Sequence, residues 1–187
     1  MRLFVLAVLI GLLHAGEPPG LIKPGAVIQQ IGSGYAFTEG PAVGEDGRVY
    51  FTDIPNERIM MWMPDGTISL WREDSGGANG LLMRAGQLYA CLGGRRQVVT
   101  IASDGSMNPL AFQGNKKRFN SPNDLWVDTQ GGVYFTDPRY GAKEGIEQDG
   151  EHVWYIAPGV AQAQLAAGDF TRPNGIVGTP DGRRLYV

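Results

Sequence analysis

The sequence is poor in the residues that build disulfides, zinc sites and nucleophilic sites. Its 187 residues include one cysteine and two histidines. The single cysteine, Cys91, cannot form an intramolecular disulfide, and its apolar context LYACL favours a buried, inert thiol. No Gly-x-Ser-x-Gly, His-Glu-x-x-His or phosphate-loop motif occurs. The sequence therefore supports none of the chemistries that these motifs carry, a serine triad included.

Basic side chains are neither in excess nor concentrated in one block. The chain carries 16 Lys and Arg against 19 Asp and Glu, a net charge of -3. The densest basic stretch is the short NKKRF at residues 115–119. Proteins hold a phosphate backbone with clustered positive charge, so we expect no nucleic-acid partner and a small-molecule ligand instead.

The one long apolar stretch covers residues 3–13 and is too short to span a bilayer by itself. It follows Arg2 and is succeeded by the small residues Ala15 and Gly16, which is the pattern of a secretory signal. We therefore expect a signal peptide over residues 1–16, a secreted or periplasmic protein, and no membrane attachment after cleavage.

Glycine and proline, by contrast, are abundant, with 28 and 12 residues spread along the chain. Asp-Gly pairs recur between apolar segments, at Asp46-Gly47, Asp65-Gly66, Asp104-Gly105 and Asp181-Gly182. Such pairs tolerate the positive φ of tight hairpins, so each one predicts a turn between two short strands. No ten-residue segment after the apolar start shows a helical stripe, which disfavours a run of βαβ units.

Four segments of the chain can be aligned on one another. Each has a polar residue followed by Gly or Asp, a short apolar strand, a Gly-containing turn and a second strand centred on Tyr. They are EGPAVGEDGRVYFTD from Glu39, ANGLLMRAGQLYACL from Ala78, SPNDLWVDTQGGVYFTDP from Ser121 and RPNGIVGTPDGRRLYV from Arg172. Second hairpins follow the first three copies, at residues 58–71, 96–111 and 152–166. The repeat starts roughly every 40–50 residues, a period typical of propeller blades.

Two hairpins per repeat make a four-stranded antiparallel blade, so the sequence predicts an all-β propeller of about three and a half blades. The blades cover residues 39–187 and follow a lead-in, residues 17–38, with a possible closing strand. The last residues, LYV, read as the apolar middle of a strand, where a domain does not normally end. We therefore expect a truncated propeller that by itself is unstable or aggregating, and inactive.

Equivalent positions in a propeller form a ring about its axis, and polar residues fill one such position in all four repeats: Glu39, Asn79, Asn123 and Asn174. We expect them to converge at one mouth of the central channel. One carboxylate and three carboxamide oxygens suit Ca²⁺ or another oxygen-loving divalent ion better than zinc. One carboxylate binds a dication weakly, so we expect a second acid from further blades. Taken singly, Asn79 and Asn174 also fit ordinary turns.

Three further sets of side chains have a structural interpretation beside a functional one. Arg118, in KKRFNSPND, either orients an anionic or hydroxyl-rich ligand at the same mouth or is a solvated loop charge. Asp53 and Asp137, both in FTD at strand ends, are interpreted first as turn-capping acids and second as ligands. The four tryptophans lie in strand patterns, where packing between blades is the expected role.

Together, these segments resemble the SMP-30/gluconolactonase/LRE family of six-bladed β-propellers. The resemblance rests on EGPAVGEDGRVYFTD, ANGL, KRFNSPNDLWVDTQGGVYFTDPRYG and RPNGIVGTPDGRRLYV, and runs from about residue 39 to residue 187. It implies a metal-dependent lactonase or a related ester hydrolase, with one divalent ion, most often Ca²⁺, at the channel mouth.

The resemblance also implies roles for particular residues. Glu39 of EGP and Asn174 of PNG would bind the metal, and Asn123 of SPND would face the substrate and in some members also touch the metal. Arg118 and Asn79 sit where some members contact substrate. The family's essential aspartate, a metal ligand and the expected general base, would lie beyond Val187, so we expect no catalytic base among these residues.

The main functional hypothesis is hydrolysis of a sugar-type lactone by a metal-activated water. The ion would polarise the carbonyl, the aspartate would take the proton, and Asn123 with Arg118 would steer the ring oxygens. Two alternatives stay open. One is a secreted, non-catalytic propeller that binds a ligand on one face, and the other is an aryl-ester or phosphotriester hydrolase on the same scaffold.

Overall fold

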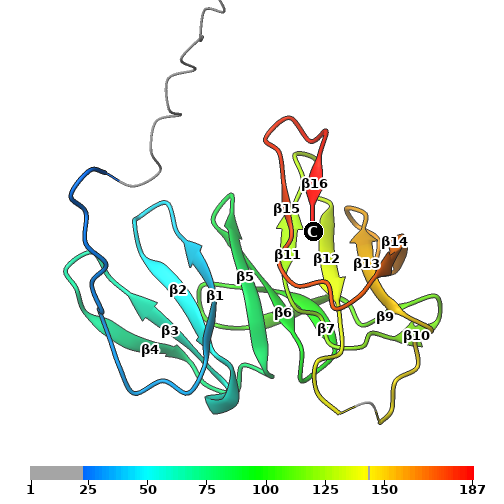
Figure 1. Cartoon of the computed structure of the whole chain (residues 1–187), viewed down its shortest axis with the longest axis horizontal. Coiled ribbons are helices and arrows are strands. Elements are labelled where there is room, and N and C mark those ends of the chain that lie inside the picture. Colours follow the sequence, from blue (N-terminus) through cyan, green and yellow to red (C-terminus); the bar gives the residue numbers. More distant parts are fainter. Residues whose placement is uncertain (1–22, 143) are drawn as a thin grey trace, which may run out of the picture. The chain divides into compact units, whose positions relative to one another are not determined.

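The computed structural model describes residues 23–142 and 144–187 (Figure 1). The chain divides into two units, residues 1–31 and residues 32–187. The described part of the first unit contains no helix or strand, and the second unit has none before residue 38. The expected signal peptide lies outside the described residues, so it stays a prediction, as does the closing strand of the lead-in.

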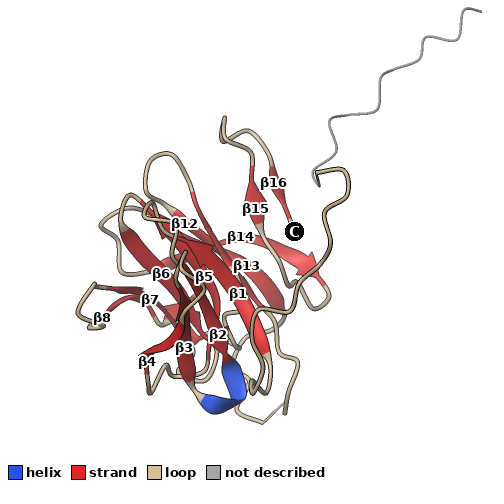
Figure 2. Ribbon diagram, turned by 90° about the vertical axis from the view of Figure 1, so that its left-hand side faces the viewer, coloured by secondary structure: helices blue, strands red, loops and turns tan. Residues whose placement is uncertain are grey.

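The first sheet of the second unit has four antiparallel strands in the order β1-β2-β3-β4. Its strands are β1 (Thr38–Val43), β2 (Val49–Asp53), β3 (Arg58–Trp62) and β4 (Ile68–Arg72). Between β2 and β3 the chain makes one 3-10 turn, η1 (Ile54–Asn56), which Figure 2 shows in blue. This turn is the only helical element among the described residues.

The second sheet repeats the same order, β5-β6-β7-β8. Its strands are β5 (Ala78–Arg84), β6 (Gln87–Leu92), β7 (Gln97–Ile101) and β8 (Met107–Ala111). In both sheets the first strand carries an irregularity of register just after it begins, between Glu39 and Ala42 in β1 and between Ala78 and Leu81 in β5. The first strands of these two sheets, β1 and β5, therefore bend at equivalent positions.

The third sheet contains the same four-stranded unit with an addition at its outer edge, in the order β10-β9-β14-β13-β12-β11. Its strands are β9 (Gln113–Gly114), β10 (Lys117–Arg118), β11 (Leu125–Val127), β12 (Val133–Asp137), β13 (Glu151–Ile156) and β14 (Ala163–Phe170). A two-stranded sheet, β15 (Val177–Gly178) with β16 (Leu185–Tyr186), follows. The structure confirms the predicted all-β propeller of about three and a half four-stranded blades.

The hairpins are held by the turn chemistry that the Asp-Gly pairs predicted. In four turns an aspartate Oδ1 accepts the backbone N–H of the residue two positions later, at 2.8–3.1 Å: Asp46, Asp65, Asp104 and Asp181. The glycine that follows each of these aspartates has a positive φ, between 68° and 90°. Local sequence thus determines where each of these hairpins turns.

Two apolar clusters lie between successive sheets. One joins the first and second sheets through side chains such as Tyr50, Ile59 and Val99. The other joins the second and third sheets and is built around Phe135 and Trp154, both fully buried. Face-to-face packing of successive sheets is the arrangement of propeller blades, and it explains the burial of Trp154. The expected role of the tryptophans is confirmed for Trp154.

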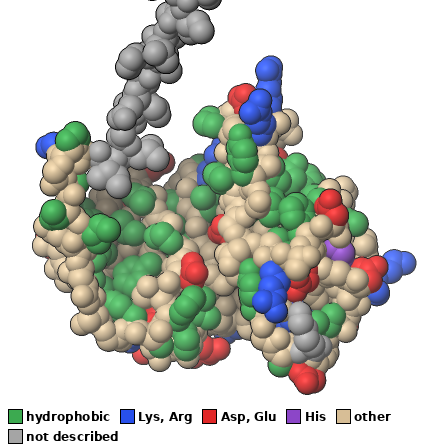
Figure 3. All heavy atoms as spheres, viewed as in Figure 1, with side chains coloured by type: hydrophobic (Ala, Val, Ile, Leu, Met, Phe, Trp, Pro, Cys, Tyr) green, Lys and Arg blue, Asp and Glu red, His purple; other side chains and the backbone are tan. Residues whose placement is uncertain are grey.

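Charged side chains are mixed over the face shown in Figure 3, where acidic and basic groups alternate without one continuous basic area. The described residues include no helix with the length and hydrophobicity that are needed to cross a membrane.

Candidate functional site

The innermost strands of the four sheets begin around one cavity of about 310 Å³, which we call the hub cavity. Its lining comes from the starts of β1 and β5 and from the segments that lead into β11 and β15. All four residues of the predicted ring are part of this lining: Glu39, Asn79, Asn123 and Asn174. The predicted convergence is therefore observed, whereas the metal-binding and substrate-binding roles of these residues stay predictions.

The ring residues differ in their exposure to solvent. Asn123 retains 6% of its exposed surface, Glu39 and Asn79 are half-buried, and Asn174 is exposed. Within the described residues, the side-chain amide of Asn123 has no hydrogen-bond partner although it lines the cavity. A buried amide without a protein partner is a group that a ligand or an ordered water satisfies.

Three larger hollows lie elsewhere on the second unit. One, of about 370 Å³, is apolar and lined by Tyr89 and Val133 among others. Another, of about 730 Å³, is open and polar and lies around Arg58 and Glu73. The third, of about 340 Å³, lies around Gln148. None of them collects equivalent positions of the repeats, so the hub cavity is the site on which the repeat pattern and the geometry agree.

Glycines let the innermost strands approach one another closely enough to form the hub cavity. Gly40 has φ +52°, and a Cβ there would lie 2.2 Å from the carbonyl oxygen of Asn79. A Cβ at Gly80 would lie 2.7 Å from the carbonyl oxygen of Asn123, to which the Gly80 N–H donates at 2.7 Å. These contacts leave no room for a side chain, so glycine is required where one blade meets the next.

Buried threonines also tie neighbouring blades together at this point. The Oγ1 of Thr52 donates to the carbonyl oxygen of Asn79 at 3.1 Å, and the Oγ1 of Thr136 donates to that of Asn174 at 2.6 Å. Both threonines come from FTD sequences, and both are fully buried. Their role was not predicted from the sequence, although the repeated FTD was a signal that could have identified them.

The second sheet carries Cys91 at the position that Thr52 and Thr136 occupy in their sheets. Cys91 is fully buried, as the sequence predicted. Burial raises its pKa well above the usual value, and the negative charges of Asp124 and Asp137 add to the effect. The thiol therefore stays protonated and unreactive, in agreement with the expected inert role.

Asp124 is a second carboxylate of the hub cavity that the sequence analysis missed. Its Oδ2 accepts the N–H of Ile176 at 3.0 Å, which links the third sheet to the segment that leads into β15. Burial raises the pKa of Asp124, hydrogen bonds from Ile176 and Leu125 oppose the rise, and the negative charge of Glu39 adds to it. Two acids thus face one cavity.

Asp53 and Asp137 cap the segments that precede β1 and β11, which confirms their interpretation as capping acids. Asp53 Oδ1 accepts the N–H groups of Ala36 and Phe37 at 2.9 and 3.1 Å. Asp137 accepts the N–H groups of Asn120 and Ser121 at 2.9 and 2.7 Å. Each acid therefore holds in place the chain that leads a ring residue to the cavity. Neither lines the hub cavity.

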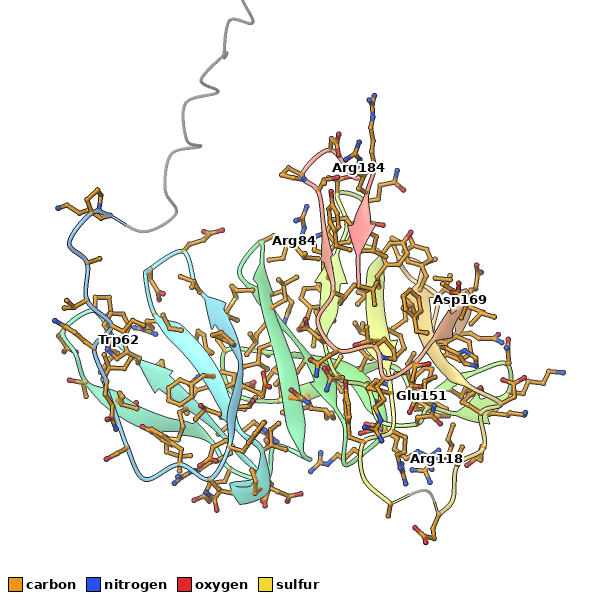
Figure 4. All side chains as sticks on the ribbon, viewed as in Figure 1. Trp62, Arg84, Arg118, Glu151, Asp169 and Arg184 are labelled. Carbon is orange, nitrogen blue, oxygen red and sulfur yellow. The ribbon has the colours of Figure 1, made fainter. Side chains whose placement is uncertain are left out.

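Arg118 is not brought to the hub cavity. It lies on β10 and is exposed, and its backbone N–H donates to the Glu147 carboxylate at 2.9 Å. Figure 4 shows Arg118 toward the opposite end of the blades from Arg84, the last residue of β5. Arg118 is thus at the end where β5 begins, outside the cavity lining, and its substrate-binding role stays a prediction.

The donor set of the hub cavity matches a hard divalent cation. It offers the carboxylates of Glu39 and Asp124 and the amides of Asn79, Asn123 and Asn174, without Lys, Arg or His in the lining. The described residues contain no group of three or more His, Cys, Asp or Glu placed to hold a metal, so amide oxygens would have to complete the ligand set. Ca²⁺ accepts such mixed oxygen ligands.

Successive antiparallel sheets, packed face to face with an oxygen-lined cavity where their innermost strands start, define a β-propeller with a polar central site. The family model described as the SMP-30/Gluconolactonase/LRE-like region matches residues 37–187. The chain belongs to this family.

Individual relatives agree with the family. A gluconolactonase of Zymomonas mobilis is 31% identical, and the match covers 86% of this chain and 51% of the relative. The structure of a Xanthomonas campestris gluconolactonase superposes with a TM-score of 0.76 at 30% identity, over 81% of this chain and 54% of the other. The structure of a second protein, which is only assigned as a gluconolactonase, superposes with a TM-score of 0.77 at 29% identity. The match covers 86% of this chain and 58% of the other.

The chain spans about half the length of these relatives. A more remote neighbour, a streptogramin B lyase structure, has a TM-score of 0.60 at 15% identity, covering 78% of this chain and 46% of the other, and shows a shared fold alone. The family membership places the chain among gluconolactonase-like proteins.

Proposed function

We propose that the protein hydrolyses a sugar-type lactone with the help of one divalent ion, most suitably Ca²⁺, in the hub cavity. The observation that carries the proposal is the convergence of Glu39, Asn123 and Asn174 from three different sheets on one cavity, in a chain of the gluconolactonase-like family. The proposal includes export through the apolar start of the chain and a small-molecule substrate.

In this proposal Glu39, Asn174 and Asn123 would hold the ion. When bound, a divalent ion supplies polarisation of the lactone carbonyl and a lower pKa for the attacking water. Asn123 and Asn79 would offer their amides to the ring oxygens and hydroxyls of the sugar. The hydroxyls of Thr52 and Thr136 keep the backbone of Asn79 and Asn174 in place, so the ring is organised before ligand arrives.

The test is the substitution Glu39→Gln in the protein expressed from the full open reading frame that contains these residues. We expect hydrolysis of a sugar δ-lactone, followed by proton release at constant pH, to fall by at least about 100-fold, since weaker perturbations around metal ligands already cost 10–100-fold. Chelation of the unmodified protein with EDTA has the same effect, and Ca²⁺ restores the rate.

Glu45→Gln is the matched control, because Glu45 lies in the turn of the same β1–β2 hairpin and is exposed. This variant retains full activity. If the Glu39→Gln variant hydrolysed the lactone at an unchanged rate, the proposed metal-dependent hydrolysis would be wrong. Turnover of aryl esters or phosphotriesters without lactones would favour the related hydrolase, and ligand binding without any turnover would favour a non-catalytic propeller.

A further inference from the structure

Asp124 breaks a pattern that the other sheets keep. The residue after the ring position is Gly40, Gly80 and Gly175 in the other three repeats, and it is an aspartate only in the third. Glycine is required at Gly40 and Gly80 by the close approach of the next strand. The third repeat departs from this pattern, because Asp124 stands where the other repeats have glycine. The side chain of Asp124 is part of the lining of the hub cavity.

The position of this carboxylate is determined by its neighbours on both sides. Its Oδ2 accepts the Ile176 N–H at 3.0 Å, from the segment that leads into β15. On the other side its Oδ1 approaches Gly80, where a Cβ would lie only 2.5 Å away. Asp124 is thus held between the innermost strands of the second and fourth repeats. Because Gly80 has no side chain, it leaves the room that the carboxylate needs.

The charge of the hub cavity is uncompensated among the described residues. Glu39 and Asp124 are both in the lining, and no Lys, Arg or His accompanies them. Neither carboxylate takes part in an ion pair within the described part of the chain. Two negative charges in a partly buried cavity repel each other, and a divalent cation between them removes that repulsion.

A second, independent observation points to a ligand in the same cavity. Asn123, the residue before Asp124, retains only 6% of its exposed surface, and its amide has no partner within the described residues although it lines the cavity. The same cavity therefore holds a side-chain amide without a protein partner and two carboxylates without a counter-charge. Both features are resolved by an oxygen-seeking cation.

We propose that Asp124 is the second acid of the divalent-cation site, and that together with Glu39 it supplies the negative charge that makes the hub cavity bind Ca²⁺. This role rests on the proposed function and deepens it. It also modifies the expectation that the second acid would have to come from further blades, because one acid is already supplied by the third sheet. Asp124 acts on affinity for the ion, and no step of hydrolysis is assigned to it.

The test is Ca²⁺ binding by the protein expressed from the full open reading frame and by its Asp124→Asn variant, measured by titration calorimetry. Asparagine keeps an oxygen that can accept the Ile176 N–H and removes only the charge, so we expect the fold to persist and the Kd for Ca²⁺ to rise about tenfold or more. Asp124→Gly provides a second variant, because glycine is what the other three repeats carry at this position.

Asp128→Asn is the matched control. Asp128 follows the same strand, β11, and its Oδ1 accepts two backbone N–H groups at 2.8 Å, but it does not line the hub cavity. We expect its Kd for Ca²⁺ to equal that of the unmodified chain. Circular dichroism and a thermal melt of each variant without Ca²⁺ check that it has folded.

The possible outcomes separate this inference from the proposed function. Weaker Ca²⁺ binding in Asp124→Asn and Asp124→Gly, with normal binding in Asp128→Asn, supports it. If both Asp124 variants bind Ca²⁺ as tightly as the unmodified chain while Glu39→Gln does not, the inference is wrong and the proposed metal site stands. If the unmodified chain binds no Ca²⁺, both are wrong.

Discussion

At the scale of single residues, two aspartates in equivalent positions show how much the surroundings of a buried carboxylate determine its pKa. Asp53 and Asp137 both end FTD sequences and are fully buried. Burial would raise the pKa of Asp53, but hydrogen bonds from Asn56, backbone N–H groups and Arg58 outweigh it and lower the pKa to about 2. At Asp137 burial dominates and raises the pKa to about 6. The strand partner is Arg58 in one case and His152 in the other.

This contrast predicts opposite pH dependences. The folded-state pKa of Asp137, about 6, lies above its ordinary value of 3.8, so its contribution to stability is present below about pH 4 and is lost as the pH rises through 6. Between pH 4 and 7 we expect the free energy of unfolding to fall by about 3 kcal/mol relative to the Asp137→Asn variant, measured by urea unfolding.

Asp53→Asn is the control for this experiment. Its folded-state pKa of about 2 lies below 3.8, so its contribution is present above about pH 4 and is lost only as the pH falls through 2. The difference between the unmodified chain and Asp53→Asn therefore stays constant between pH 4 and 7. Parallel profiles for all three proteins would contradict the account of Asp137.

Some residue roles were predictable from the sequence. The capping roles of Asp53 and Asp137 were predicted from their place at strand ends, although the N–H groups that they cap lie 16–17 residues earlier in the chain. The role of Asp124 was not predicted, because it depends on Gly80 and Ile176, which belong to other repeats. In the sequence, Asn-Asp before a strand is an ordinary turn pair, and only the approach of two neighbouring strands turns it into a cavity residue.

At the scale of elements, the hairpins followed the repeat closely. The segments predicted at residues 58–71 and 96–111 became β3–β4 and β7–β8. The small hairpin β9–β10 was not predicted, because two-residue strands carry no readable periodicity. Its turn uses Asn115 and Lys116, both with positive φ, and β9 joins the third sheet through Ala163 on β14.

Contacts between innermost strands predict a strong penalty for any side chain at Gly80. A Cβ there would lie 2.6 Å from Asp124 Cα and 2.7 Å from the Asn123 carbonyl oxygen, which are backbone atoms that cannot rotate away. We expect Gly80→Ala to lower the free energy of unfolding by about 2 kcal/mol or more, through forced separation of β5 from β11. Chemical denaturation measures the loss.

Gly141→Ala controls for the loss of backbone freedom at glycine. A Cβ at Gly141 would meet no atom within 4 Å, and its φ is not in the left-handed region. We expect this variant to change the free energy of unfolding by no more than about 0.5 kcal/mol. Equal effects of the two substitutions would show that the close contact at Gly80 does not limit stability.

At the scale of the whole molecule, one small cavity draws on all four repeats of the chain. The hub cavity is lined by residues between Glu39 and Ile176, so a cation bound there would connect segments from all four repeats. Because such a cation binds the folded chain alone, it would stabilise the whole arrangement by mass action.

This linkage predicts that Ca²⁺ raises the melting temperature of the chain. At a concentration of about 100 times its Kd, Ca²⁺ adds about 2.7 kcal/mol to the free energy of unfolding. Differential scanning calorimetry with increasing Ca²⁺ measures the shift, and EDTA reverses it. Glu39→Gln, the control, melts at the same temperature with and without Ca²⁺. If Ca²⁺ did not change the melting temperature of the unmodified chain, a cation site that spans the sheets would be ruled out.

Local patterns were sufficient for the strands and hairpin turns of the four-stranded blades, the blade repeat and the ring of Glu39, Asn79, Asn123 and Asn174, because turn chemistry and alternation act between residues close in the chain. Packing between sheets decided the rest. It placed Asp124 in the hub cavity, left Arg118 outside it, and gave Asp53 and Asp137 opposite pKa shifts. These outcomes depend on burial and on partners from distant segments, which exist only after the blades have come together.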